Sequence, residues 1–210
     1  VQVGYLFRHH PTYQQVKLWL ADGLVGEPHM ALVRMGGRGS AAAWKHRRAD
    51  GGGVVNEMIV HKLDLLIWFF GELALEKVHA RYTLMPQRVI NGQTHEGDAE
   101  DFLLAEMQSG PTKIFLQGDL ATPTYMENVE IHGDNGSIVA SIVEGFRSYL
   151  WLREPKGDWT AGYHYSEPGT VDLFTAELSA FLNDLGREAD YGLLEQAARQ
   201  VHILEELRGW

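Results

Sequence analysis

Gly51-Gly52-Gly53-Val54-Val55-Asn56-Glu57-Met58-Ile59-Val60-His61-Lys62-Leu63-Asp64 is the stretch that decides the fold of this chain. A glycine triplet leads directly into a segment that carries Glu57, His61 and Asp64 at positions i, i+4 and i+7. On an α-helix these three side chains share one face, which Trp68 extends at i+11. The other positions are almost all apolar, and this predicts a buried helix from Gly53 to Phe70, ended by Gly71.

The polar row Glu57, His61 and Asp64 is the first candidate for a functional site. Burying a carboxylate and an imidazole is costly unless each is paired or used. One interpretation is a structural hydrogen-bond network, and the other is a site of chemistry. The triplet 51–53 favours the second, because glycines at a helix start let a ligand or another backbone approach closely. A purely structural helix prefers a Ser, Thr, Asp or Asn cap, and Asp50 remains available for that role.

The composition is that of an ordinary globular protein, with 210 residues, 45% hydrophobic and 22% charged. A formal net charge of −10 argues against general binding to nucleic acids or anionic membranes, which requires a basic surface. The chain has no cysteine, which excludes disulfides, thiol nucleophiles and cysteine-ligated metals and fits a cytoplasmic protein. The longest apolar run, within residues 63–70, is far shorter than the ~20 residues of a membrane span.

Periodicity predicts helices at both ends of the chain and strands between them. The first elements are a strand over Val1–Phe7, a helix over Pro11–Asp22 closed by Gly23, and a strand over His29–Met35. From about residue 75 the period changes to two, and the predicted strands are Val78–Leu84, Phe102–Glu106, Lys113–Asp119, Asn128–Ile131, Ser137–Ile142 and Tyr149–Arg153. Apolar stripes predict two final helices, Thr170–Leu185 and Tyr191–Leu207. Turn signals between the strands favour antiparallel pairing, so we expect one α+β domain over residues 1–210.

A short basic cluster, Trp44-Lys45-His46-Arg47-Arg48, precedes the glycine triplet in this acidic protein. One interpretation is a solvated loop. The alternative is that Lys45 or Arg47 meets an anionic group of a substrate or cofactor while Trp44 packs on it. The remaining histidines lack ligand spacing, and Glu57-x-x-x-His61 is not the H-E-x-x-H motif of zinc proteases. The sequence therefore predicts no metal site.

These motifs together resemble the C-terminal domain of the glucose–fructose oxidoreductase / inositol dehydrogenase / MocA family of NAD(P)-dependent oxidoreductases. The triplet with Glu57, His61 and Asp64 is similar to the family's core pattern, G-G-G-x-x-x-D-x-G-x-H-x-x-D. Further motifs in the family's order are Val3-Gly4-Tyr5 with Arg8 and Pro11, Gly23-Leu24-Val25-Gly26-Glu27-Pro28, Glu100-Asp101, and Ile131-His132-Gly133-Asp134-Asn135-Gly136-Ser137. The similarity covers essentially the whole chain.

The resemblance implies an open, mostly antiparallel sheet with helices packed on one face. It also implies homo-oligomers formed through the other sheet face. By position, His61 would be the general base that takes a proton from a substrate hydroxyl, and Glu57 would orient or polarise the substrate or His61. We predict substrate contacts at Asp64, Trp44, Lys45 and Arg47, and cofactor contacts at Gly51, Gly52 and Gly53.

The chain departs from the family in three respects. Position 57 is Glu where Asp is more common, and Ile59 stands where Gly is usual. The Rossmann domain and its E-K-P motif are absent from this sequence. We therefore expect the chain to be inactive alone and to bind no cofactor tightly, because the cofactor carries the hydride chemistry.

Two functions follow from this comparison. The first is the substrate-binding and oligomerisation domain of a parent enzyme that uses NAD or NADP. That enzyme would oxidise a secondary hydroxyl of a sugar- or polyol-type substrate. The alternative is a stand-alone, non-catalytic carbohydrate-binding or assembly module of the same fold.

Overall fold

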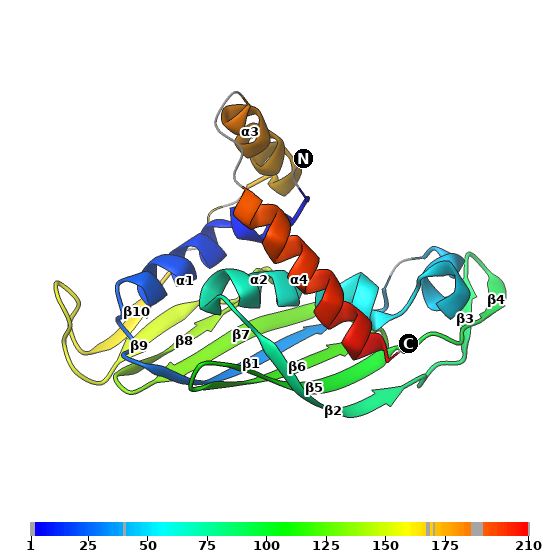
Figure 1. Cartoon of the computed structure of the whole chain (residues 1–210), viewed down its shortest axis with the longest axis horizontal. Coiled ribbons are helices and arrows are strands. Elements are labelled where there is room, and N and C mark those ends of the chain that lie inside the picture. Colours follow the sequence, from blue (N-terminus) through cyan, green and yellow to red (C-terminus); the bar gives the residue numbers. More distant parts are fainter. Residues whose placement is uncertain (1–2, 40, 167–168, 170, 186–190, 210) are drawn as a thin grey trace.

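The computed structural model describes residues 3–39, 41–166, 169, 171–185 and 191–209. Its centre is an eight-stranded sheet in the order β10-β9-β8-β7-β1-β6-β5-β2 (Figure 1). The strands are β1 Pro28–Gly36, β2 Ala74–Tyr82, β5 Phe102–Ser109, β6 Thr112–Asp119, β7 Met126–Gly133, β8 Gly136–Ala140, β9 Tyr149–Leu152 and β10 Gly162–Tyr165. Strands β1 and β6 are parallel, and the other neighbouring pairs in this sheet are antiparallel.

The longer helices are α1 Pro11–Ala21, α2 Val60–Phe70, α3 Leu173–Asp184 and α4 Tyr191–Arg208. Helices α1, α2 and α4 lie over one face of the sheet, and α3 stands farther from it (Figure 1). Short turns of 3-10 helix occupy Leu6–His9, Ala43–His46 and Arg48–Asp50, and a π-helical turn, Val55–Ile59, leads into α2. The predicted α+β fold, a mostly antiparallel sheet with helices on one face, is confirmed. No helix in the described ranges is long and apolar enough to cross a lipid bilayer.

Alternation along the strands places the core between the sheet and α2. Val33, Leu116 and Ile131 point to the helix side, while their strand neighbours point to the opposite face. Ile59 packs directly over Gly118 of β6, where a Cβ atom would collide with the Ile59 side chain. The bulky residue at a position that is usually glycine in the family is thus accommodated by a glycine in the sheet beneath it.

The predicted strand at the N-terminus is wrong over its described part. Val1 and Gln2 lie outside the described residues, and Leu6–His9 form a 3-10 turn instead of a strand. Side chains of this turn contact α2: Phe7 stacks on His61 and Arg8 bonds Asp64. Because these contacts go to a helix, the apolar residues here do not need a neighbouring strand.

Three strands were not predicted from periodicity. The hairpin of β3 (Gln87–Ile90) and β4 (Gln93–Glu96) turns at Asn91-Gly92, where both residues have positive φ (50° and 78°). Asn-Gly is a strong hairpin signal because both central residues of a type I′ turn need positive φ. The third strand, β10, lies at the sheet edge.

The two C-terminal helices differ from their predicted apolar stripes. Thr170, the predicted start of the first, lies outside the described residues, and α3 begins at Leu173. Its residues Phe174 and Leu178 are 72% and 57% exposed, so this stripe is not covered by the described chain. In α4, Ile203 and Leu207 enter the core, whereas Val201 stays 52% exposed.

Candidate functional site

The start of the α2 segment is held by backbone contacts. The N–H of Val54 donates to the carbonyl of Glu100 over 2.8 Å, and the N–H of Glu57 donates to the carbonyl of Gly53 over 3.0 Å. Asp50 does not cap the helix, since its carboxylate pairs with Arg47 Nε at 2.7 Å. The polar row therefore follows a turn fixed by main-chain hydrogen bonds.

The glycine triplet fits tightly inside the chain. The N–H groups of Gly51, Gly52 and Gly53 donate to the carbonyls of Arg48, Arg47 and Lys45 over 2.9–3.0 Å. A Cβ atom at position 52 would collide with the Lys45 carbonyl, and one at position 53 with the Glu100 carboxylate. These close approaches account for two of the three glycines without any ligand. The predicted cofactor contact of the triplet stays a prediction.

The structure brings Glu57 together with part of the basic cluster. Lys45 Nζ lies 2.6 Å from Glu57 Oε2, and the two side chains are 30% and 19% exposed. The same ammonium lies 5.6 Å from the centre of the Trp44 ring, which is 48% exposed. Trp44, Lys45 and Glu57 thus form one polar and aromatic group at the start of the helix. Arg47 is not part of it, since it pairs with Asp50.

His61 lies one turn beyond Glu57 and is half-buried. Its imidazole stacks on Phe7, with ring centroids 5.1 Å apart and planes inclined by 29°. Burial lowers the pKa of His61; Glu57 opposes this shift, while Lys62 and Lys45 add to it. A lowered pKa keeps the ring neutral near pH 7, which is the form that can accept a proton.

Asp64 is at the buried end of the polar row, with 1% exposure. Arg8 Nε donates to both carboxylate oxygens over 3.0 and 2.8 Å, and Arg8 Nη2 donates over 2.6 Å. Burial raises the pKa of Asp64 to about 6, against the hydrogen bonds and charge of Arg8. Arg8 and Trp68 also line a cleft of about 310 Å³ next to α4. Here Asp64 anchors the N-terminal turn to α2, and its predicted substrate contact stays a prediction.

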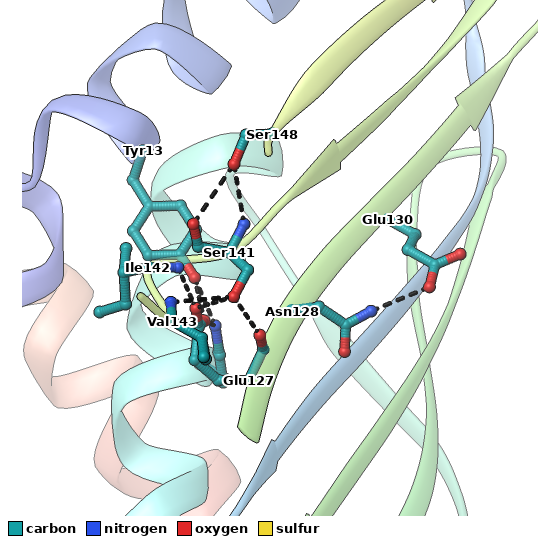
Figure 2. Close-up of polar contacts among 9 residues, drawn as sticks. Tyr13, Glu127, Asn128, Glu130, Ser141, Ile142, Val143 and Ser148 are labelled. Carbon is teal, nitrogen blue, oxygen red and sulfur yellow. Dashed lines mark hydrogen bonds and ion pairs between the residues drawn. The ribbon is translucent and has the colours of Figure 1, made fainter. Parts of the chain in front are cut away.

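A buried ionic network beneath the row was not predicted. Lys62 Nζ donates to Glu127 Oε2 and to the Tyr13 hydroxyl (2.7 Å), and that hydroxyl also donates to Glu127. The side chains of Lys62 and Glu127 are fully buried. Figure 2 shows Tyr13, Ser141 and Ile142 gathered around Glu127. Lysine is almost never fully buried without a partner. The position of Lys62 within an apolar helix was therefore the sequence signal that could have predicted a buried ion pair.

The other oxygen of Glu127 is also satisfied. Oε1 accepts hydrogen bonds from Ser141 Oγ (2.9 Å) and from the backbone N–H of Ile142. Burial opposes ionisation of Glu127, but Lys62, the Tyr13 hydroxyl and the Ile142 N–H outweigh it and lower the pKa of Glu127. The pair joins α2 to β7 and to the segment that follows β8 as a charged, hydrogen-bonded unit.

Among the residues that the structure describes, no cluster of three or more His, Asp or Glu side chains could hold a metal ion. The charged groups that act on His61 are the Glu57 carboxylate and the ammonium groups of Lys62 and Lys45. This arrangement suits proton transfer and the binding of hydroxyl groups.

Comparison with known proteins defines the class. The profile of the GFO/IDH/MocA C-terminal domain matches residues 13–139, more than half of the chain. The chain therefore belongs to the GFO/IDH/MocA family, as its C-terminal domain, in agreement with the resemblance of the core motif.

Two curated relatives are inositol dehydrogenases. Inositol 2-dehydrogenase of Rhizobium meliloti (strain 1021) is 25% identical over 190 residues, covering 88% of this chain and 52% of the relative. Inositol 2-dehydrogenase/D-chiro-inositol 3-dehydrogenase of Shouchella clausii (strain KSM-K16) is 27% identical over 192 residues, covering 88% and 49%. The chain thus spans about half the length of these relatives.

A solved structure shares the fold. Levoglucosan dehydrogenase, in complex with NADH and L-sorbose, superposes with a TM-score of 0.80 at 16% identity. The match covers 99% of this chain and 63% of that one.

Proposed function

We propose that this chain, as a single domain, is the substrate-binding and oligomerisation domain of an NAD(P)-dependent oxidoreductase. The parent enzyme oxidises a secondary hydroxyl of a sugar- or polyol-type substrate, with His61 as the general base. The proposal is carried by Lys45, in the turn Ala43–His46, paired with Glu57, and by His61 one turn beyond Glu57. The names of the relatives, inositol and levoglucosan dehydrogenases, support the substrate class.

His61 has the properties that a base for an alcohol needs. Its pKa is lowered mainly by burial, so the neutral imidazole is available near pH 7. A secondary alcohol gives up hydride far more readily as its hydroxyl proton departs, and the imidazole accepts that proton. The nearby Glu57 carboxylate favours the imidazolium formed in this step, because opposite charges stabilise each other.

Glu57, Lys45 and Trp44 supply the groups that a polyhydroxylated substrate requires. The Glu57 carboxylate, held by Lys45, accepts hydrogen bonds from substrate hydroxyls. The Lys45 ammonium donates to a substrate oxygen, and the exposed Trp44 ring offers a flat apolar surface to a sugar ring. Arg47, which pairs with Asp50, and Asp64, which pairs with Arg8, are the further substrate contacts that we propose.

The nicotinamide cofactor supplies the hydride acceptor when it is bound in the parent enzyme. The N–H groups of Gly51, Gly52 and Gly53 already donate to carbonyls, so the cofactor contact predicted for this triplet would not use these N–H groups. We therefore assign NAD or NADP binding to a separate cofactor domain. That domain would also cover the exposed apolar stripe of α3, where Phe174 and Leu178 face outward.

We also propose that the parent enzyme is cytoplasmic. The test of the activity is an assay of this enzyme produced with its cofactor domain. It should reduce NAD⁺ or NADP⁺ with at least one member of a panel of inositols, anhydrosugars and aldoses, whereas this chain alone should reduce neither. The absence of NAD(P)H absorbance with every member of the panel would contradict the proposed activity.

The open face of the sheet is the proposed site of oligomerisation. Leu32 and Phe115, partners on the adjacent strands β1 and β6, lie on this face and line a groove with Leu104. At the β10 edge of the same face, Tyr163 and Tyr165 are 59% and 50% exposed. A second copy of this chain, related by two-fold symmetry, would cover these apolar side chains.

Phe115→Asp should convert the oligomer of this chain to monomers, because it places a carboxylate between Leu32 and Leu104 in the apolar part of this face. Sedimentation velocity at micromolar concentration measures the change. Val201→Asp, on the solvent side of α4, is the matched control and should keep the assembly intact. An unchanged mass for Phe115→Asp would place the interface elsewhere.

A second candidate function is a non-catalytic carbohydrate-binding module. The exposed Trp44 beside the Lys45–Glu57 pair favours it, since this group needs no cofactor to contact a sugar. Titration calorimetry of this chain with the same panel separates the two. Sugar binding by this chain, without NAD(P)⁺ reduction by the parent enzyme, would support the binding-module function. The absence of sugar binding by this chain would exclude that function.

A further inference from the structure

Phe7 lies between His61 and a buried positive charge. Its ring is stacked on the His61 imidazole, and the ammonium of Lys62 lies 5.6 Å from its ring centre. Since His61 and Lys62 are consecutive residues of α2, their side chains leave the helix in different directions. The Phe7 ring packs between the His61 and Lys62 side chains. Tyr13 packs behind it, with ring centroids 6.0 Å apart.

The Lys62 ammonium has a fixed position. It is bonded to Glu127 and to the Tyr13 hydroxyl, and it lies 4.9 Å from the centre of the Tyr13 ring. Glu127 is in turn bonded to Ser141 and Ile142, as Figure 2 shows. A buried polar network with every member satisfied is rigid, because any displacement leaves a buried group unpaired. The cation therefore attracts the electron-rich face of the Phe7 ring from one defined direction.

The backbone of the N-terminal turn is anchored as well. Arg8, the next residue, donates three hydrogen bonds to Asp64, one turn beyond His61 on the same face of α2. His10 Nδ1 accepts from the N–H of Thr12 and caps α1. Phe7 is thus held from both sides, by its neighbour in the sequence and by the buried network.

We propose that Phe7 is a positioning residue for His61: the ring, held by the Lys62 ammonium, fixes the plane of the imidazole. The inference rests on the proposed function of His61 as general base. A base must keep its nitrogen aligned with the substrate hydroxyl, and a small misplacement of a reacting group lowers the rate by up to about 10²-fold. Neither Phe7 nor Lys62 needs to touch the substrate in this role.

The test uses Phe7→Leu, which keeps an apolar side chain but removes the ring. In this chain, the His61 ring-proton resonances should move downfield, because the ring current of Phe7 no longer shields them. The pKa of His61 should also rise toward its ordinary value as water reaches the imidazole, with Glu57, Lys62 and Lys45 as the charges that face it. Phe7→Tyr retains the ring, so the His61 ring-proton shifts and the His61 pKa should stay at their wild-type values.

In the parent enzyme, Phe7→Leu should lower kcat by about 10–10²-fold with little change in KM. Trp159→Leu is the matched control, since Trp159 is also half-buried and packs on a histidine, His164, at 5.1 Å and 86°. It should leave kcat and the His61 resonances unchanged. The double variant Lys62→Met/Glu127→Gln removes the cation without leaving an unpaired charge and should shift the His61 resonances in the same direction as Phe7→Leu.

The outcomes separate this inference from the proposed function. Unmoved His61 resonances in Phe7→Leu overturn the inference. Shifted resonances with unchanged kcat also overturn it, provided that His61→Ala is inactive. If His61→Ala keeps full turnover, the proposed function fails, and the resonances alone then decide whether Phe7 positions the ring.

Discussion

Replacing His61 by alanine should lower the turnover of the parent enzyme by about 10²–10⁴-fold, the usual contribution of a general base. Alanine removes the only imidazole of the polar row, while Glu57 and Lys45 keep their ion pair. Substrate binding should change less than kcat, because the loss falls mainly on the transition state. Steady-state kinetics of NAD(P)H formation with the best substrate of the panel measures both.

His202→Ala is the control for this experiment. His202 lies on α4 with 73% of its side chain exposed, and its Nε2 lies 3.6 Å from Glu206 Oε1. Its removal should leave turnover within about twofold, since surface substitutions away from a site have small effects. A His61→Ala enzyme with normal turnover would show that another group takes the proton.

Replacing Lys62 by methionine should lower the free energy of unfolding of this chain by about 3–5 kcal/mol. Methionine matches the length and shape of the lysine stem, but it leaves the Glu127 carboxylate buried without its ammonium. The cost is therefore mainly the unpaired charge rather than lost packing. Urea unfolding followed by circular dichroism measures it.

A second variant separates charge from packing. Lys62→Met/Glu127→Gln removes both charges, and it should be clearly more stable than Lys62→Met alone. Lys113→Met is the control at an exposed pair, since Lys113 lies 3.5 Å from Glu106 with 43% of its side chain exposed. That change should cost at most about 1 kcal/mol. Equal destabilisation by the single and double Lys62 variants would mean that the charge pair contributes little.

Local patterns were enough to predict most elements. The two-residue period of Phe102–Glu106 and Lys113–Asp119 predicted strands that the structure extends by only a few residues, as β5 and β6. The helix Pro11–Asp22 was predicted from Pro11 and Gly23, and Gly23 indeed has φ +62°. These signals are local because a helix or strand depends on neighbouring residues and on which face is apolar.

Local patterns failed where long-range contacts decide the conformation. The apolar segment 3–7 has the composition of a strand, but its turn is bonded to α2 through Phe7 and Arg8. The helical period correctly predicted that α3 is a helix. Its apolar residues Phe174 and Leu178, however, are not covered by any element of the described chain. Periodicity shows which residues share a face but not what packs against it.

The candidate site also combines features set by local sequence patterns with features set by long-range contacts. The sequence by itself determined the fold class and the family, and its helical spacing predicted the row of Glu57, His61 and Asp64. Only the tertiary structure decided what surrounds each of them. Glu57 forms an ion pair with Lys45, Asp64 forms one with Arg8, and the His61 ring stacks on Phe7. The tertiary structure also decided the partner of Lys62, which is 65 residues away on β7. Burial and pairing of charges depend on residues distant in the sequence, and no spacing rule contains that information.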